Sequence, residues 1–436
     1  MPEPATAETD RTIALLRRRA EPLPPIDTDA FASAFDRFGE AKVVLLGEAT
    51  HGTADFYRAR AAITRRLVER HGFRLVAIEA DWPDVADLDR FVRNQGVWGR
   101  EPTFVNFPRW MWRNAEFAAL VRDLRALNLP RQPADRVELR GLDVYSMTQS
   151  QARVVDYLAG VDPVAAANAA RRYGCLRPFL DAPQRYGYAA HMGRVDCEDA
   201  VVAQLVDLLA RKRAYARDHD HAYLDAEQNA RVVVSAEAYY RAMYRGSVES
   251  WNLRDDHMFR TLMRLLSARG PEAKAVVWAH NSHVGDASAT AMGSAGEHNI
   301  GQLCRQAFGR DCVSIGFFTD RGRVAAADDW GSPARIKEVL PSRADSWERL
   351  FLEAGHPRSL TDWRGDPVLA QVLAGARRER AIGVIYRPDS ELASHYFEAR
   401  LSRQFDAAVW FEKTTPVTAL SGAPAEGAPD IYPFGL

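Results

Sequence analysis

The sequence predicts an α/β fold: a mostly parallel central sheet flanked by helices, with a large helical insertion over the carboxyl edge of the sheet. Three observations predict it. Short apolar runs of strand length alternate with amphipathic helical segments, which is the pattern of strand–helix–strand crossovers. These runs are apolar at nearly every position, as in strands that are buried on both faces. Residues 148–270 show only helical patterns.

The first third of the chain contains three predicted strands, each followed by a predicted helix. Helical connections between strands imply parallel pairing with right-handed crossovers. Pro83 and the acidic Asp84 suit the start of the helix after the second strand. We expect strands at residues 43–46, 73–79 and 137–142, and helices at 31–38, 54–70, 85–94 and 115–127.

The insertion and the last part of the chain continue this pattern. Two aromatic segments, 185–188 and 250–252, are expected to interrupt the helices of the insertion, which we place at residues 151–159, 198–218, 225–245 and 254–268. A hairpin is expected at 312–318 and 323–327, because Asp320-Arg321-Gly322 has the composition of a turn. Further strands are expected at residues 273–279, 381–386 and 407–412.

The chain therefore divides into five predicted segments. They are a flexible N-terminal arm (1–25), the first part of the α/β core (26–147), the helical insertion (148–270), the second part of the core (271–420) and a C-terminal tail (421–436).

The composition favours a protein of the cytoplasm. Of 436 residues, 57 are Lys or Arg and 58 are Asp or Glu, so no global basic field favours nucleic acid as a partner. No apolar run approaches the roughly 20 residues that span a bilayer, and the N-terminus lacks the basic and apolar regions of a signal peptide. Four cysteines are too few and too scattered for a disulfide framework or a thiolate zinc site. We expect no membrane partner, and the sequence leaves the oligomeric state open.

Polar side chains follow four of the predicted strands at the point where each strand ends. The carboxyl ends of neighbouring parallel strands meet at one edge of a sheet, where ligands bind in open α/β folds. If these strands are neighbours, their polar groups face a single crevice. The pairs are Glu48 and His51, Glu79 and Asp81, Asp143 and Tyr145, and His280 and His283.

Histidines and glutamates in one crevice indicate proton transfer. An imidazole with a pKa near neutrality can accept a proton from water or a substrate hydroxyl, and a carboxylate beside it fixes the tautomer. Alternatives stay open for several of these residues: Glu48 as a helix cap, Glu79 in a structural ion pair with Arg58 or Arg60, and Asp81 and Asp143 as turn caps.

Aromatic and basic side chains near the strand ends are candidates for substrate binding, although such residues more often pack at the surface. No G-x-S-x-G elbow and no P-loop occurs, so serine hydrolase and NTPase activities have no support. The histidines and glutamates are metal-ligand types, but the chain has no HExxH motif. The candidate substrate-binding residues are Arg58, Asp81, Trp82, Trp110, Arg113, Asp143, Tyr145 and Arg254.

Five blocks of sequence resemble the erythromycin esterase family. In chain order they are GEATHGTADFYRARAAITRRLVE, RLVAIEADWPD, GLDVYSM, WAHNSHVGD and GVIYRP…SHYFEARLSRQFDAAVWFE, spread over residues 43–412. The resemblance implies an α/β core with a helical insertion and a deep cleft. It also implies hydrolysis of a macrolide lactone by histidine-activated water, without an essential metal or other cofactor. The catalytic residues it implies are His51 as general base with Glu48, Arg60, Glu79, His280 and His283.

The first hypothesis is thus a metal-independent esterase or lactonase acting on a macrolide-like natural product, as in antibiotic resistance or secondary metabolism. A second keeps the site but runs an elimination, an acyl transfer or a rearrangement with the same base. A third is a protein that binds a metal or haem in the cleft, because the family resembles a wider group with such members.

Overall fold

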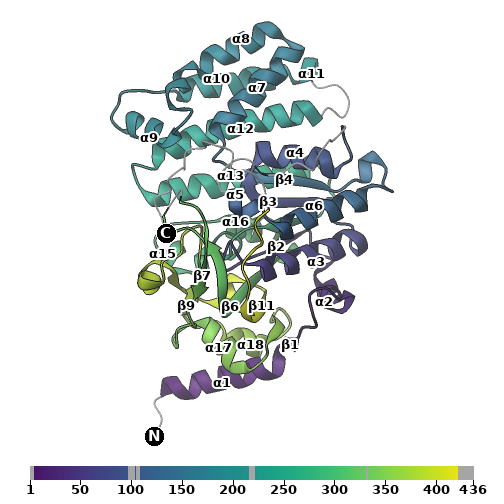
Figure 1. Cartoon of the computed structure of the whole chain (residues 1–436), viewed down its shortest axis with the longest axis vertical. Helices are drawn as coiled ribbons and strands as arrows, with labels where there is room; N and C mark the ends of the chain where they lie inside the picture. Colours follow the sequence, from purple (N-terminus) through teal and green to yellow (C-terminus); the bar gives the residue numbers. More distant parts are fainter. Residues whose placement is uncertain (1–3, 97–103, 105–108, 216–220, 330–331, 421–436) are drawn as a thin grey trace.

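The sheet is the centre of the molecule. The computed structural model describes residues 4–96, 104, 109–215, 221–329 and 332–420 (Figure 1). Within these residues a nine-stranded sheet has the order β1-β8-β11-β6-β2-β5-β3-β4, with β7 paired to β6. Its strands are β1 (Glu21–Pro22), β2 (Val43–Leu46), β3 (Leu75–Asp81), β4 (Glu138–Asp143), β5 (Ala275–Trp278), β6 (Cys312–Ala326), β7 (Arg335–Val339), β8 (Arg358–Asp362) and β11 (Ala407–Thr414). A separate ribbon pairs β9 (Arg377–Arg380) with β10 (Tyr396–Ala399).

Pairing within the sheet is mostly parallel. The six strands from β11 to β4 run parallel to one another, and the antiparallel pairs are those of β8, β1 and β7. The predicted fold class, a mostly parallel α/β sheet flanked by helices, is therefore confirmed.

Helices cover both faces of the sheet because alternate strand residues point to opposite sides. Val44 and Leu46 join a hydrophobic core with one set of helices, whereas Val43 and Leu45 join a second core with the other set. The first set is α2 (Asp29–Ser33), α3 (Ala54–Arg70), α4 (Trp82–Val92), α5 (Arg109–Trp112) and α6 (Ala115–Asn128). The second includes α1 (Pro4–Arg19), α13 (Ser247–Arg269), α16 (Ile300–Phe308), α17 (Trp347–Ala354), α18 (Pro367–Val372) and α20 (Leu401–Gln404).

The helices between β4 and α13 form their own layer, which lies beyond the β4 edge of the sheet, next to α4 (Figure 1). They share a third hydrophobic core in which Tyr186 and Tyr240 are fully buried. They are α7 (Met147–Val161), α8 (Pro163–Arg172), α9 (Pro183–His191), α10 (Glu198–Ala210), α11 (Lys212–Tyr215) and α12 (His221–Ala242). Short helices α14 (Asn281–Val284), α15 (Ala291–Ser294) and α19 (Glu391–Ser394) complete the described α-helices. The division of the chain at residues 147 and 270 stays a prediction.

Two of the four cysteines form a disulfide. Cys175 and Cys197 are joined as a disulfide within the insertion, a pairing that the sequence did not indicate, whereas Cys304 and Cys312 are buried and free. In the described part of the chain, no helix combines the length and apolar character needed to cross a membrane.

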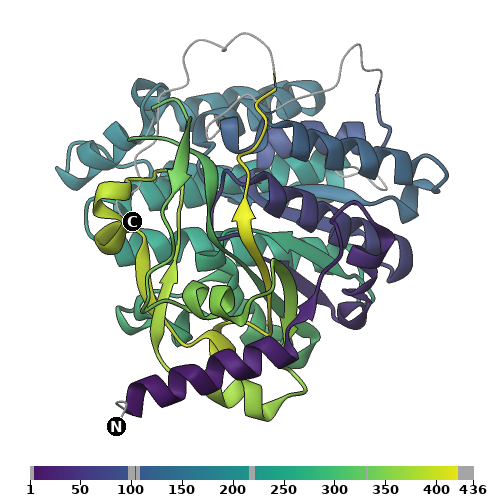
Figure 2. The same cartoon turned by 60° about the horizontal axis from the view of Figure 1, so that its bottom comes forward.

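The N-terminal segment differs from its prediction. We expected a flexible arm over residues 1–25, but residues 4–19 form α1, which packs alongside α17 and α18 (Figure 2). Leu15 and Leu16 are buried in the sheet's second core, and the Arg17 guanidinium donates hydrogen bonds to the carbonyls of Glu353 and Ala354. The expected C-terminal tail, 421–436, lies outside the described residues.

The predicted hairpin at residues 312–327 is wrong. β6 runs straight through the expected turn, because β11 pairs with it up to Gly322 and β7 pairs with it from Gly322 onward. A Cβ atom at Gly322 would lie 2.2 Å from the Thr414 carbonyl oxygen, so this glycine permits close backbone approach rather than a turn. The strand expected at 381–386 is reduced to isolated bridges of Ile382 with Thr50 and of Ile385 with Ala327.

The two aromatic segments of the insertion are helical rather than interruptions. Residues 185–188 lie within α9, where Tyr186 packs into the third core and donates a hydrogen bond to Glu237. Residues 250–252 lie within α13, which starts seven residues before the predicted helix. Tertiary packing, here the full burial of Tyr186, outweighs the modest helix propensity of aromatic residues.

Candidate active site

The four strands that end in polar residues are neighbours in the sheet. β2, β5, β3 and β4 are adjacent in this order and parallel, so their carboxyl ends meet at one edge. Glu48 and His51 follow β2, and His280 and His283 follow β5. Asp81 is the last residue of β3 and Glu79 stands two positions before it. Asp143 is the last residue of β4.

Two glycines allow the segment after β2 to sit against its neighbours. A Cβ atom at Gly47 would lie 2.1 Å from Oδ1 of Asn281, and one at Gly52 would lie 1.9 Å from the carbonyl oxygen of Ala325. Real Cβ atoms do not approach other atoms so closely. Side chains at these two positions would therefore push Glu48 and His51 away from β5 and β6.

A chain of three buried side chains orients His51. The Arg60 guanidinium donates a hydrogen bond to Oε2 of Glu48, and Oε1 of Glu48 lies 2.9 Å from Nδ1 of His51. Since a carboxylate accepts, the hydrogen of neutral His51 is on Nδ1 and its Nε2 carries a lone pair. Arg60 is fully buried and its guanidinium lies over the Trp278 ring at 4.5 Å. His51 is 6 % exposed, and no described residue bonds its Nε2.

His280 faces His51, with 4.9 Å between the ring centroids. The Ser282 backbone N–H donates to Nδ1 of His280, and the Ser282 hydroxyl lies 2.8 Å from the same nitrogen. Burial, followed by the neighbouring His51, lowers the pKa of His280 well below its usual value, so the ring is neutral. With Nδ1 accepting, the hydrogen is on Nε2, which is buried and meets no described group in hydrogen-bond geometry, including the nearby Ala49 carbonyl.

Glu79 is held from both sides. Its Oε1 accepts from Arg254 Nη2 at 2.7 Å and its Oε2 accepts from the backbone N–H of His280 at 2.8 Å. Burial acts to raise the pKa of Glu79, but His283, Arg254 and His51 together hold it well below the usual value. The ion-pair partner of Glu79 is thus Arg254, and not Arg58 or Arg60 as we had considered.

Arg254 is fully engaged by protein groups. Its Nε and Nη2 donate to the two oxygens of Asp143 at 2.9 and 2.7 Å, and its guanidinium lies 4.9 Å from the centre of the Tyr145 ring. Asp143 and Tyr145 therefore support Arg254. These contacts give Arg254 a role in holding two carboxylates, and its role in binding a substrate stays a prediction.

His283 lies on the far side of Glu79. Both oxygens of Asp255 are within 3.0 Å of its Nδ1, and its Nε2 lies 3.0 Å from Arg254 Nη1 and 3.4 Å from Glu79 Oε1. The Trp251 ring stacks on it, 4.5 Å away and 5° from parallel. Burial opposes a charge on this ring, but Asp255 and Glu79 outweigh it and raise the pKa of His283.

Sequence reasoning missed three residues here: Trp251, Asp255 and Ser282. Trp251 and Asp255 stand four positions apart in one helix, flanking the Arg254 that we had selected, so helical periodicity was a usable signal. Ser282 lies between the two histidines and had no signal of its own.

Asp81 links two strand ends. Its Oδ1 accepts from the backbone N–H groups of Tyr145 and Ser146, at 2.9 and 3.2 Å. Burial, together with the neighbouring Asp143, raises the pKa of Asp81 well above the usual value. These contacts favour the structural alternative, a cap of the turn after β4.

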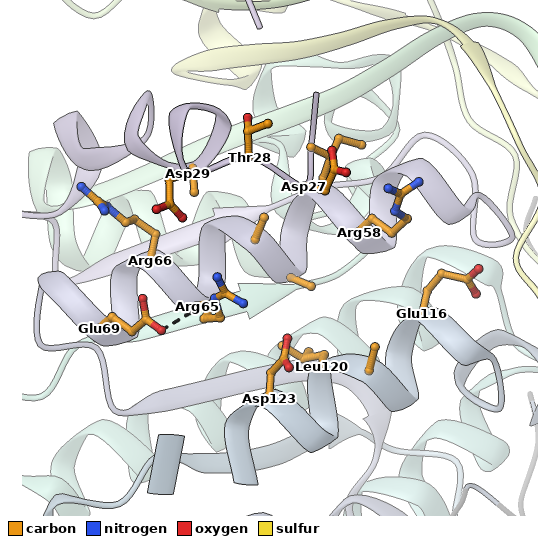
Figure 3. Close-up of a pocket in the computed structure, with 15 residues that line it drawn as sticks. Asp27, Thr28, Asp29, Arg58, Arg65, Arg66, Glu69, Glu116, Leu120 and Asp123 are labelled. Carbon is orange, nitrogen blue, oxygen red and sulfur yellow. Dashed lines mark ion pairs between the residues drawn. The ribbon is translucent and has the colours of Figure 1, made fainter. Parts of the chain in front are cut away.

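Several candidates for substrate binding lie elsewhere. Arg58 is exposed on the outer face of α3, where it lines a pocket of about 300 Å³ with Arg65 and Glu116 (Figure 3). Trp82 is buried in the second core beneath the guanidinium of Arg140, and Trp110 packs on the first core. No described contact joins Arg58, Trp82 or Trp110 to the histidines, because helix geometry directs these side chains to other faces.

Arg113 is half-buried between α5 and α6, and its backbone carbonyl accepts from Leu420. None of its described contacts joins it to His51, His280 or His283. Residues 105–108, which precede α5, lie outside the described residues.

A metal site in the crevice would need several ligand side chains that face one point. Among the described residues, no group of three or more His, Cys, Asp or Glu side chains is arranged to hold a metal ion. The Nδ1 atoms of His51 and His283 face carboxylates, and Glu48 and Glu79 face guanidinium groups. The arrangement leaves two nitrogens for chemistry: Nε2 of His51 as an acceptor and Nε2 of His280 as a donor.

A comparison with protein-family models identifies one family. The family model described as erythromycin esterase matches residues 68–414, a region that contains Glu79, His280 and His283 and begins after Glu48 and His51. A Bacillus subtilis (strain 168) protein named "Putative hydrolase YbfO" is 19% identical over 394 residues, covering 86% of this chain and 84% of its own length.

Solved structures share the fold. A Bacillus cereus protein superposes with a TM-score of 0.76 at 19% identity, covering 95% of this chain and 99% of its own. A protein described as a succinoglycan biosynthesis protein gives 0.76 at 20% identity, with coverages of 94% and 99%. A mutant of erythromycin esterase EreC in its open conformation gives 0.64 at 18% identity, with coverages of 89% and 94%.

Proposed function

Because this chain belongs to the erythromycin esterase family, which makes it a hydrolase of that family, we propose that it cleaves a carboxylic ester or lactone with water activated by His51. The substrate class we propose is a natural-product ester or macrolactone. The observation that carries the proposal is the Arg60–Glu48–His51 chain, which leaves Nε2 of His51 unpartnered at the carboxyl edge of the sheet.

His51 is the proposed general base. Its Nε2 takes a proton from water as the water oxygen attacks the ester carbonyl carbon, and Glu48 stabilises the imidazolium that forms. When the tetrahedral intermediate collapses, the C–O bond to the alcohol breaks and the imidazolium returns that proton to the leaving alkoxide oxygen. Arg60 acts through Glu48, because its guanidinium fixes the carboxylate against the ring. A carboxylate–histidine pair of this kind is a common way to activate a weak nucleophile.

His280 is the proposed donor to the carbonyl oxygen. A neutral imidazole with its hydrogen on Nε2 can stabilise the oxyanion of a tetrahedral intermediate, and a buried donor is effective because no water competes with it. The lowered pKa of His280 and its unpartnered Nε2 support this role. Among the described residues, Nε2 of His280 has no hydrogen-bond partner whereas both nitrogens of His283 face protein groups, so His283 is proposed to position Glu79 and Arg254.

No step of this reaction requires a metal or another cofactor, and we propose that none is used. Activity that survives exhaustive chelation is the expected result. Stoichiometric metal or haem in the purified protein would instead favour a binding function for the cleft.

We also propose a cytoplasmic location. The oxidation state of Cys175 and Cys197 in cells tests it, because disulfides are rare in that compartment.

A second candidate uses the same base for a different reaction. One structural relative is described as a biosynthesis protein, and an imidazole beside a carbonyl can also abstract a carbon-bound proton in an elimination. The mass of the product separates the two, because hydrolysis adds one water to the substrate and elimination does not.

The experiment is His51→Ala, with His71→Ala as its matched control. His71 caps the C-terminus of α3 in a similar cluster of Arg, carboxylate and His, since its Nε2 lies 2.7 Å from Asp36 and Arg66 also binds that carboxylate. That cluster stands at the other end of a 17-residue helix, roughly 25 Å away. A panel of esters and macrolactones is screened by mass.

His51→Ala should lower kcat by at least about 100-fold, the usual contribution of a general base, while the circular dichroism spectrum is unchanged. His71→Ala should retain activity. A His51→Ala protein with near-wild-type turnover would refute the proposal.

A further inference from the structure

One face of α13 contacts the site with three side chains. Trp251, Arg254 and Asp255 stand at i, i+3 and i+4, so they project from the same face of the helix. All three contact His283: Trp251 stacks on its ring, Arg254 approaches Nε2 and Asp255 approaches Nδ1. The indole N–H of Trp251 donates to the His298 carbonyl, which holds the ring in place.

Asp255 is itself fixed on two sides. It is fully buried, its Oδ1 accepts the backbone N–H of Ile300 at 2.8 Å, and both its oxygens reach Nδ1 of His283. A carboxylate accepts hydrogen bonds and donates none. Nδ1 of His283 must therefore carry a hydrogen, whether or not the ring is charged.

The hydrogen on Nδ1 determines what the other nitrogen can do. In the neutral ring Nε2 carries a lone pair, which receives the N–H of Arg254 Nη1 at 3.0 Å. The other N–H groups of Arg254, on Nε and Nη2, then donate hydrogen bonds to Asp143 and Glu79. The second oxygen of Glu79, Oε2, accepts the backbone N–H of His280. A continuous path of contacts thus joins Asp255 to His280.

We infer that Asp255 is a positioning residue of the proposed hydrolysis: it keeps a proton on Nδ1 of His283 and thereby holds Arg254, Glu79 and the backbone of His280 in register. This inference rests on the proposed function, in which His280 binds the carbonyl oxygen. Through Asp255, α13, the last helix of the predicted insertion, contributes to the geometry of the strand ends.

The test is Asp255→Asn, an isosteric change that removes one acceptor. The Asn Oδ1 takes the Ile300 N–H, so its NH2 group faces Nδ1 of His283 and the ring must move its hydrogen to Nε2. That hydrogen then points at an N–H of Arg254, two donors oppose each other, and Arg254 and Glu79 shift.

Asp256→Asn is the matched control. Asp256 is the next residue of the same helix and also pairs with a histidine, since its Oδ1 lies 3.1 Å from Nε2 of His298. That pair is half-exposed and has no described contact with Glu79 or His283. Comparing the same substitution at these adjacent positions therefore distinguishes an effect on the site from a general effect on the helix.

Two readouts are used. With a chromogenic ester such as p-nitrophenyl acetate, Asp255→Asn should lower kcat about 10- to 100-fold with little change in KM, whereas Asp256→Asn should stay within about twofold. Nitrogen-15 NMR of histidine-labelled protein, recorded at a pH where the ring is neutral and with His283→Gln to identify the signal, should show the His283 hydrogen on Nδ1 in the wild type and on Nε2 in Asp255→Asn. The double variant Asp255→Asn/His283→Gln should be no worse than His283→Gln alone.

Full activity of Asp255→Asn, an unchanged tautomer, equal losses in the two Asn variants, or unfolding of Asp255→Asn would each overturn the inference. The NMR readout needs no substrate. A tautomer change in Asp255→Asn together with full activity of His51→Ala would therefore refute the proposed function while leaving the contact between Asp255 and His283 established.

Discussion

At the scale of single residues, the position of His51 depends on groups that take no part in chemistry. Glu48 and Arg60 set the ring's tautomer, and Gly47 and Gly52 let the segment between them approach β5 and β6. In the sequence the two glycines stand on either side of the polar residues, as GEATHG at positions 47–52. Their actual role, close contact with Asn281 and Ala325, involves residues more than 200 positions away and required the structure.

Gly52→Ala should be destabilising because the new methyl group has no space beside the Ala325 carbonyl. Overpacking of a buried site costs about 1–3 kcal/mol in the free energy of unfolding, measured by urea denaturation. Gly160→Ala is the control, since this glycine lies within α7 with no atom within 4 Å of an added Cβ, and alanine there should raise stability by about 0.5 kcal/mol. Equal effects of the two substitutions would contradict the close contact at Gly52.

At the scale of elements, α13 is the connection between the insertion and the sheet. It packs its apolar face on the second core and presents Arg254 to carboxylates from two different strands, Glu79 of β3 and Asp143 of β4. The sequence predicted a helix at residues 254–268 but placed Trp251 outside it, because an aromatic–polar segment carries no helical period by itself. Tertiary packing of the indole on His283 is what extends the helix over this residue.

Arg254→Met should leave Glu79 and Asp143 without their shared cation. Removing one partner of a buried ion pair costs about 3–5 kcal/mol, because the remaining charge stays in the protein interior. Arg260→Met, on the same helix, removes only an exposed pair with Asp256 and should change stability by less than about 0.5 kcal/mol. A loss below about 1 kcal/mol in Arg254→Met would show that the carboxylates find other partners.

Strands were predicted correctly where the sequence signal is local, and wrongly where the strand depends on pairing with distant residues. The runs at 43–46, 273–279 and 407–412 were identified because a strand buried on both faces has a local signature. β6 was divided at Asp320-Arg321-Gly322, since those three residues have the local composition of a turn. Its continuity comes from pairing with β11 and β7, which lies beyond any local pattern.

At the scale of the whole molecule, the free energy of unfolding depends on pH through buried titratable groups, of which His395 is one. Its Nε2 accepts the backbone N–H of Arg387, and burial lowers the pKa of His395 to about 4. In the unfolded chain a histidine has a pKa of about 6.5. Between these two values the unfolded state binds a proton that the folded state does not.

His395 therefore contributes stability that is fully present above pH 6.5 and is lost as the pH falls toward 4. His395→Gln cannot titrate, so the difference in unfolding free energy between wild type and variant should change by up to about 3 kcal/mol over this range. Urea unfolding at a series of pH values measures it. Parallel pH curves for the two proteins would contradict a buried neutral His395.

The whole site could be predicted only in outline. Glu48, His51, Glu79, His280 and His283 were selected because each stands at a strand end, and the topology brings them to one edge. Arg58, Trp82 and Trp110 were selected by residue type near those ends, and their side chains point to other faces. Asp255 was missed because its partner, His283, is 28 residues away on another element.

The central claim is that water activated at His51 attacks an ester carbonyl. It is tested most directly by turnover of a hydrolysed ester or lactone in oxygen-18 water, with mass analysis of the acid product. The wild type should place one heavy oxygen in the new carboxyl group, and His51→Ala should form no labelled product above the uncatalysed rate. A product without label, or labelled product formed by His51→Ala at the wild-type rate, would contradict the account.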